Sequence, residues 1–148
     1  MTNQEYLQPY GRAGIFVSDI IDSMNKTYIP AILILVLVFV LHYFGIHYYL
    51  YIRFTGYDIM MHVLGGVGLG LALHWFFKTF FTNLSAKKHF WSLLIGIIIL
   101  GLLWEVMEGY YDITIAPVGT LLHWVDTVKD IINDTIGMLV AYLFVKDK

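Results

Sequence analysis

Four long apolar segments constrain the fold of this chain more than any other feature. A helix needs about 20 mostly apolar residues to cross a bilayer core of about 30 Å. Segments of that length lie at about residues 29–52, 58–81, 90–110 and 120–145. Because 59% of the 148 residues are hydrophobic and only 14% are charged, the composition excludes a disordered protein, a basic nucleic-acid-binding module and an ordinary soluble enzyme. We therefore expect one all-α transmembrane domain over residues 1–148, folded as a four-helix bundle.

The segment that precedes the first span, residues 1–28, favours a helix lying in the membrane interface. Between Ile15 and Met24 the apolar residues gather on one broad helical face, with polar residues elsewhere. This pattern is typical of interfacial amphipathic helices. A polar leader without that role is an equally good interpretation of the segment.

Glycines inside two of the spans predict close helix packing. Gly66 and Gly70 are four residues apart, as are Gly137 and Ala141. Such small residues let membrane helices approach one another closely. A dinucleotide-binding loop is excluded because no strand precedes the glycines of the second span.

Basic residues indicate which end of the bundle faces the cytoplasm. Seven of the nine lysines and arginines lie in the N-terminal segment, near residues 78–88 or at the C-terminus. Lysine and arginine are enriched on the cytoplasmic side of membrane proteins. We expect both termini to be cytoplasmic, in the inner or plasma membrane, with lipid as the immediate neighbour and no nucleic-acid partner.

Acidic residues are distributed in the opposite way, toward the outer side. Seven of the eleven lie at or near the outer ends of the spans, namely Asp58, Glu105, Glu108, Asp112, Asp126, Asp130 and Asp134. An unpaired carboxylate inside a membrane costs a few kcal/mol on insertion scales. Only Arg53 and Lys129 are near in sequence, so we expect a cation, shared protons or water to compensate the remaining charge.

The spacing of these residues predicts that they converge. Asp58 and His62 are four residues apart and share a helical face. The three aspartates of the fourth span, also four apart, form a stripe about 12 Å long at 1.5 Å per residue. Oxygen ligands with one imidazole suit Mg²⁺, Mn²⁺, Ca²⁺, Fe²⁺ or Zn²⁺. The predicted metal ligands are Asp58, His62, Glu105, Asp130 and Asp134, with Asp112, His123 and Asp126 as secondary candidates.

Helix capping is the main alternative for two of the acids. Asp58 and Asp126 lie where an N-cap or a first helical turn is expected, and a carboxylate is favourable there. Capping does not explain Glu105 and Glu108, because a negative charge at a helix C-terminus is unfavourable.

Three motifs together resemble a known family. They are Gly56-Tyr57-Asp58-x-x-x-His62, Trp104-Glu105-x-x-Glu108 and Asp126-Thr127-x-x-Asp130-x-x-x-Asp134-Thr135-x-Gly137. In order and spacing they are similar to the YjdF-like small membrane proteins and, more distantly, to the VanZ-like group. Ile59 and Asp134 stand where VanZ-like relatives often carry lysine and asparagine, which favours the YjdF-like side. The resemblance implies a multi-span membrane protein and supports the acidic site, but it does not name a reaction.

The leading functional hypothesis is a metal-dependent membrane protein that hydrolyses or transfers groups on a lipid or cell-envelope substrate. Glu108 and His62 are the predicted catalytic residues. A free carboxylate such as Glu108 could accept a proton from metal-bound water, and His62 would be a metal ligand, or the general base if no metal binds. A cation-binding or transport protein is one alternative. A non-catalytic accessory subunit of a larger membrane complex is the other. As protein partners, a second copy of the chain in a homo-oligomer and a larger membrane complex are both open.

Overall fold

The protein is helical throughout the part of the chain that its structure describes. The computed structural model describes residues 27–81, 83–111, 113 and 116–146, and these contain no β-strand. The all-α prediction is therefore confirmed for them. The helices are α2 (Ile29–His47), α3 (Leu50–Arg53), α4 (Tyr57–Phe80), α5 (Ala86–Tyr111) and α6 (Leu121–Val145). The interfacial helix predicted between Ile15 and Met24 lies outside the described residues.

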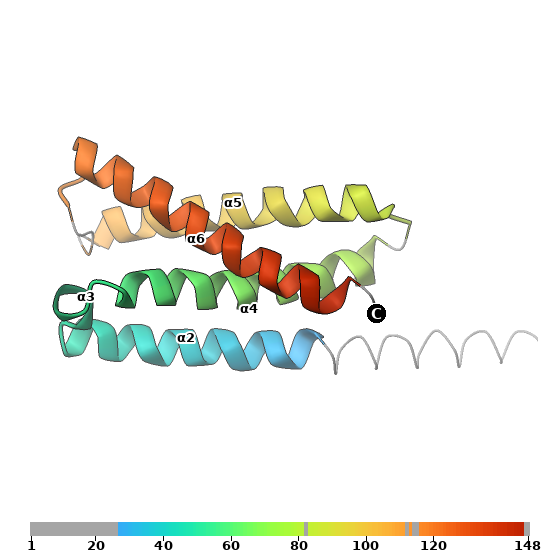
Figure 1. Cartoon of the computed structure of the whole chain (residues 1–148), viewed down its shortest axis with the longest axis horizontal. Coiled ribbons are helices and arrows are strands. Elements are labelled where there is room, and N and C mark those ends of the chain that lie inside the picture. The colour runs from blue at the N-terminus through green and yellow to red at the C-terminus, as the bar shows by residue number, and fades with distance from the viewer. Residues whose placement is uncertain (1–26, 82, 112, 114–115, 147–148) are drawn as a thin grey trace, which may run out of the picture.

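Helix α4 is the centre of the arrangement. It contacts α2, α5 and α6, and its most extensive packing is against α6. Figure 1 shows α2 and α5 on either side of α4, with α6 crossing α4 diagonally. The start of α2, the α4–α5 connection and the end of α6 lie at one end of the molecule. The short helix α3 and the start of α6 lie at the other end, called here the α3 end.

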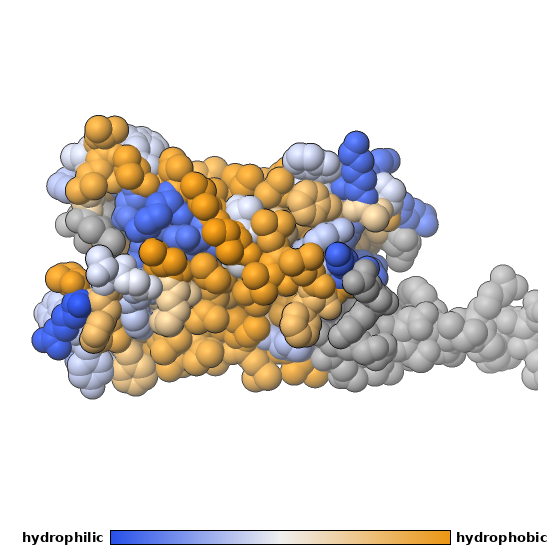
Figure 2. Space-filling view, in the orientation of Figure 1, coloured by the Kyte–Doolittle hydropathy of each residue, from blue (hydrophilic) through white to orange (hydrophobic). Residues whose placement is uncertain are grey.

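Three of the helices have the length and apolarity of membrane spans. They are α2, α4 and α5. Helix α6 has a comparable length of 25 residues, but it is not among them because its first half is charged. Hydrophobic side chains dominate the visible face of the molecule between its two ends (Figure 2). So many large apolar residues are exposed only where lipid replaces water as the solvent.

The first helix ends at His47 and not near Ile52, where the apolar run predicted its end. Tyr49 has a left-handed backbone with φ of 57°, and the chain turns back through α3. The Tyr51 ring then packs against Gly45, where an added Cβ would lie 2.6 Å from it. Aromatic and apolar residues continue through this turn, so hydropathy alone did not indicate it.

Helices α4 and α6 cross with their backbones in contact. A Cβ added at Gly137 would lie 2.8 Å from the Cα of Gly66 and still closer to the carbonyl oxygen of Val63. A Cβ added at Gly70 would lie 3.0 Å from the Cβ of Ala141. The close packing predicted from the spacing of these small residues is confirmed.

We predict that Gly137→Ala destabilises the α4–α6 crossing by about 1–3 kcal/mol, the usual cost of overpacking. The added methyl group meets backbone atoms of α4 and not the end of a flexible side chain. Gly65→Ala is the matched control, because a Cβ there meets nothing within 4 Å. Thermal unfolding of the purified protein in detergent measures both, and equal transition temperatures for the two variants would contradict the prediction.

Candidate functional site

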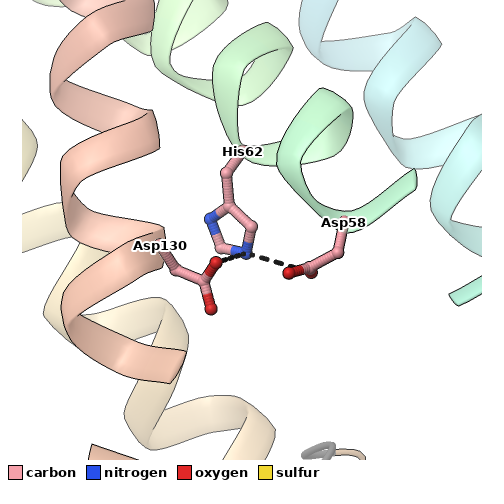
Figure 3. Close-up of side chains that lie close together, drawn as sticks. All are labelled: Asp58, His62 and Asp130. Carbon is pink, nitrogen blue, oxygen red and sulfur yellow. Dashed lines mark ion pairs between the residues drawn. The ribbon is translucent and has the colours of Figure 1, made fainter. Parts of the chain in front are cut away.

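The candidate site lies at the α3 end, where α4 and α6 begin and α5 ends. Asp58 and His62 lie one turn apart on α4, and Asp130 approaches them from α6 (Figure 3). Asp58 does not cap α4, because Gly56 is the N-cap of that helix. At the start of α6 the N-cap is Thr120, whose hydroxyl accepts from the backbone of His123. The N-cap alternative is therefore wrong for both Asp58 and Asp126, whereas the first-turn position is confirmed for Asp58 and wrong for Asp126.

The two ring nitrogens of His62 face different carboxylates. Its Nε2 lies 3.6 Å from Asp58 Oδ1 and 3.7 Å from Asp130 Oδ1. Its Nδ1 lies 3.2 Å from Asp134 Oδ1 and can donate a hydrogen bond to it. All four residues are buried. The convergence of the α4 and α6 acids on His62, expected from their spacing, is confirmed.

Asp58, His62 and Asp130 form a set with the geometry of a cation site. One ligand atom from each lies within 4.8 Å of the others. Asp130 is only 3% exposed, and its Oδ1, which faces His62, has no hydrogen-bond partner in the described part of the chain. A buried oxygen of this kind calls for an explanation such as an ion or a water.

Lys129 is the positive charge that the structure places beside this set. Its Nζ donates to Asp58 Oδ2 at 2.8 Å and to Asp126 Oδ1, and lies 3.6 Å from Asp130 Oδ1. The side chain is 38% exposed, and a hydrophilic patch reaches the surface near the start of α6 (Figure 2). Lys129 thus contacts three carboxylates, a role that spacing along one helix could not predict.

The two glutamates of α5 have different surroundings. Glu105 is buried and its Oε2 accepts a 2.7 Å hydrogen bond from Thr127 of α6. Glu108 is half-buried and accepts a 2.8 Å bond from the indole of Trp104. Neither belongs to the compact set around His62 Nε2. Glu105 ties α5 to α6, and Glu108 faces a cavity.

That cavity, with a volume of about 450 Å³, lies among α2, α4 and α5. His62, Asp134 and Glu108 line it, whereas Asp58 and Asp130 do not. His62 therefore belongs both to the cation-type set and to the cavity wall, and its partner Asp134 lies in that wall beside it.

Two further polar residues of the cavity were not predicted as site residues, His42 and Tyr51. The Tyr51 hydroxyl and His42 Nδ1 share a 2.7 Å hydrogen bond, and burial raises the pKa of Tyr51, so it stays protonated. The partner of His42 could be found only with knowledge of the turn at Tyr49, because that turn brings α3 back against α2.

The secondary candidates for metal ligands that the structure describes, His123 and Asp126, do not belong to the set around His62 Nε2. Asp126 is partly buried and bound to Lys129. His123 is buried, with its ring centroid 5.5 Å from that of Trp124, and lies outside the compact set. Asp112 lies outside the described residues.

Comparison with protein families agrees with this membrane architecture. The family model described as predicted membrane protein (DUF2238) matches residues 4–146. The chain belongs to this family. Membership fits the YjdF-like resemblance of the three motifs, all of which lie within the matched residues. No curated protein and no solved structure matches the chain, so the site must be interpreted from its own geometry.

We predict that Thr127→Val destabilises the protein by about 1.5–3 kcal/mol, because it removes a hydrogen bond to the buried Glu105 carboxylate. Thr135→Val is the matched control. The Thr135 hydroxyl donates to a backbone carbonyl of its own helix, Ile131 O at 2.8 Å, so its loss leaves no buried charge without a donor. Unfolding midpoints in detergent measure both variants. An equal loss of stability in both would show that the hydrogen bond to Glu105 contributes no more than the bond within the helix.

Proposed function

We propose that the protein is a divalent-cation-dependent membrane enzyme that hydrolyses or transfers a group on a lipid or cell-envelope amphiphile. The observation that carries the proposal is the arrangement around His62. One ring nitrogen faces two carboxylates, and the other is held by a third.

The distances suit a cation at His62 Nε2. Two ligands that are each about 2.1 Å from one ion can lie no more than about 4.2 Å apart. The Nε2 separations of 3.6 Å to Asp58 and 3.7 Å to Asp130 fall inside that limit, although they are long for hydrogen bonds. We propose Asp58, His62 and Asp130 as ligands, with Asp134 as the outer carboxylate that orients the imidazole, as in many metal sites. In this assignment Glu105 and Asp134 support the site from outside the ligand shell.

The chemistry follows from the position of the site between water and an apolar cavity. A bound divalent cation lowers the pKa of its water and can polarise an ester or phosphoryl oxygen. Glu108 lines the cavity together with His62, so we propose it as the proton acceptor for an attacking water or hydroxyl group. The Trp104 indole holds one of its oxygens and limits the orientations of the carboxylate.

We also propose α6 as a fourth membrane crossing. Its second half is apolar, and its polar residues Asp130, Asn133 and Asp134 are buried, with the two aspartates facing His62 of α4. Its C-terminal end lies at the same end of the molecule as the start of α2 (Figure 1). With the basic residues concentrated there, this topology has both termini in the cytoplasm and the site on the outer side.

Cation transport is the weaker alternative, because the described helices have an apolar barrier at their centre. Leu93, Ile97 and Met138 are essentially inaccessible and pack with Leu69 and Leu73. Along the helices this cluster lies between His62 and the buried His74–His89 pair. The role of an accessory subunit stays a prediction that no observation on these residues favours.

We predict that the purified protein binds one divalent cation and that Asp130→Asn weakens this binding at least 100-fold, because it removes a charged ligand. Asp134→Asn should weaken it about 10–100-fold, the usual effect of losing an outer-shell partner. Asp126→Asn is the matched control on the same helix. Metal analysis and calorimetric titration with Zn²⁺, Mn²⁺, Mg²⁺, Fe²⁺ and Ca²⁺ measure these effects, and wild-type protein that binds none of them would refute the proposal.

We predict that Lys129→Met binds the cation more tightly than the wild type. The ammonium group lies 2.8 Å from one proposed ligand and 3.6 Å from another, so it competes with a cation for them. Lys129→Arg is the control, because it keeps the positive charge. Weaker cation binding in Lys129→Met than in Lys129→Arg would mean that the lysine supports the site and does not compete with the ion.

A further inference from the structure

We propose that the cavity among α2, α4 and α5 binds the chain of a single-chain amphiphile with a neutral or cationic polar head. This goes beyond the proposed function, because the binding needs no metal. His62 and Asp134 line the cavity, whereas Asp58 and Asp130 do not, and its volume of about 450 Å³ falls in the range of small-molecule sites.

The walls of the cavity are suited to a hydrocarbon chain. All three helices contribute large apolar side chains, among them Leu35, Val38, Phe39, Leu69, Leu100 and Leu103. All three also meet the length and apolarity criteria of membrane spans. A chain that leaves the bilayer for this cavity loses little hydrophobic free energy, so the site can select among membrane amphiphiles by shape and head group.

The cavity opens toward the lipid. Phe39 and Leu103 both line it, yet they are 73% and 59% exposed. They belong to α2 and α5, which flank α4 on opposite sides (Figure 1). In this proposal the exposed walls that Phe39 and Leu103 form are the lateral entrance from the hydrocarbon phase, and an amphiphile need not pass through the aqueous surface.

The polar groups gather toward the α3 end of the cavity. Tyr51 belongs to α3 itself, and His42, His62 and Glu108 come from the parts of α2, α4 and α5 nearest to it. Leu35, Leu69 and Leu100 lie deeper along the same helices. An amphiphile would therefore place its head beside these groups and its chain toward the middle of the bundle.

The charges of the lining select the type of head. Two carboxylates line the cavity, Glu108 and Asp134, while no lysine or arginine does so among the described residues. A phosphate or carboxylate head would face these acids without a permanent positive charge to bind it. A hydroxyl or amine head can donate hydrogen bonds to them, so a neutral or cationic amphiphile fits and an anionic one does not.

The test uses the purified full-length protein in detergent, with a chelator present, and a monoacylglycerol that carries a photoreactive diazirine at its chain end. We expect crosslinks, located by mass spectrometry, on peptides that contain Leu35, Leu69 or Leu100. Unlabelled monoacylglycerol and a long-chain alkylamine should compete at least tenfold better than lysophosphatidic acid of the same chain length. Crosslinks confined to the exposed outer faces of the helices, or stronger competition by the phosphate head, would overturn the inference.

Cavity-filling variants provide the control. Gly65 lines the cavity, and a Cβ there meets nothing within 4 Å, so Gly65→Phe should fill the space and abolish labelling. Leu100→Trp narrows the cavity from α5 and guards against a folding defect in the first variant. Ile99→Trp adds the same indole ring to an exposed position on α5 and should label like the wild type. Unchanged labelling in both filled variants would refute the site, whereas loss of cation binding with intact labelling would refute only the proposed function.

Discussion

The backbone contact between α4 and α6 is the constraint on which the rest of the structure depends. Gly66 lies against the backbone of Asp134, and Gly137 lies against that of Val63. Because the two backbones are in contact, side chains one turn away from the contact must meet side chains of the other helix. His62 of α4 therefore reaches Asp130 and Asp134 of α6. A larger residue at either glycine would separate the imidazole from its carboxylates.

Burial of several acids is tolerated because most of them accept a hydrogen bond from a specific neighbour. Glu105 accepts a bond from Thr127, Glu108 from Trp104, and Asp58 and Asp126 from Lys129. These bonds orient the carboxylates but remove little negative charge, since Lys129 contributes one positive charge to the cluster. The residual charge is concentrated around His62 Nε2, where the Asp130 oxygen has no hydrogen-bond donor in the described part of the chain. This imbalance is the physical reason to propose a cation there.

His62 and Asp134 connect two environments of opposite character. On one side are the acids and Lys129, close to a hydrophilic patch on the surface (Figure 2). On the other side is a cavity with apolar walls that opens between two lipid-facing helices. A pair at this boundary can act on the polar head of a molecule whose chain stays in the hydrocarbon phase. Chemistry on a membrane amphiphile needs both environments within reach of one side chain.

The sequence by itself determined the membrane character, the all-helical class, the long helices and the glycine contact, because hydropathy, length and small-residue spacing act locally along one helix. Periodicity also placed Asp58 with His62 and grouped the acids of α6. Only the tertiary structure decided which acids meet the imidazole, since that depends on the crossing of α4 and α6. It also separated Glu105 and Glu108 from the compact set, and the turn at Tyr49 brought Tyr51 to His42. Contacts between helices depend on their relative rotation and depth, and no pattern within a single helix specifies these.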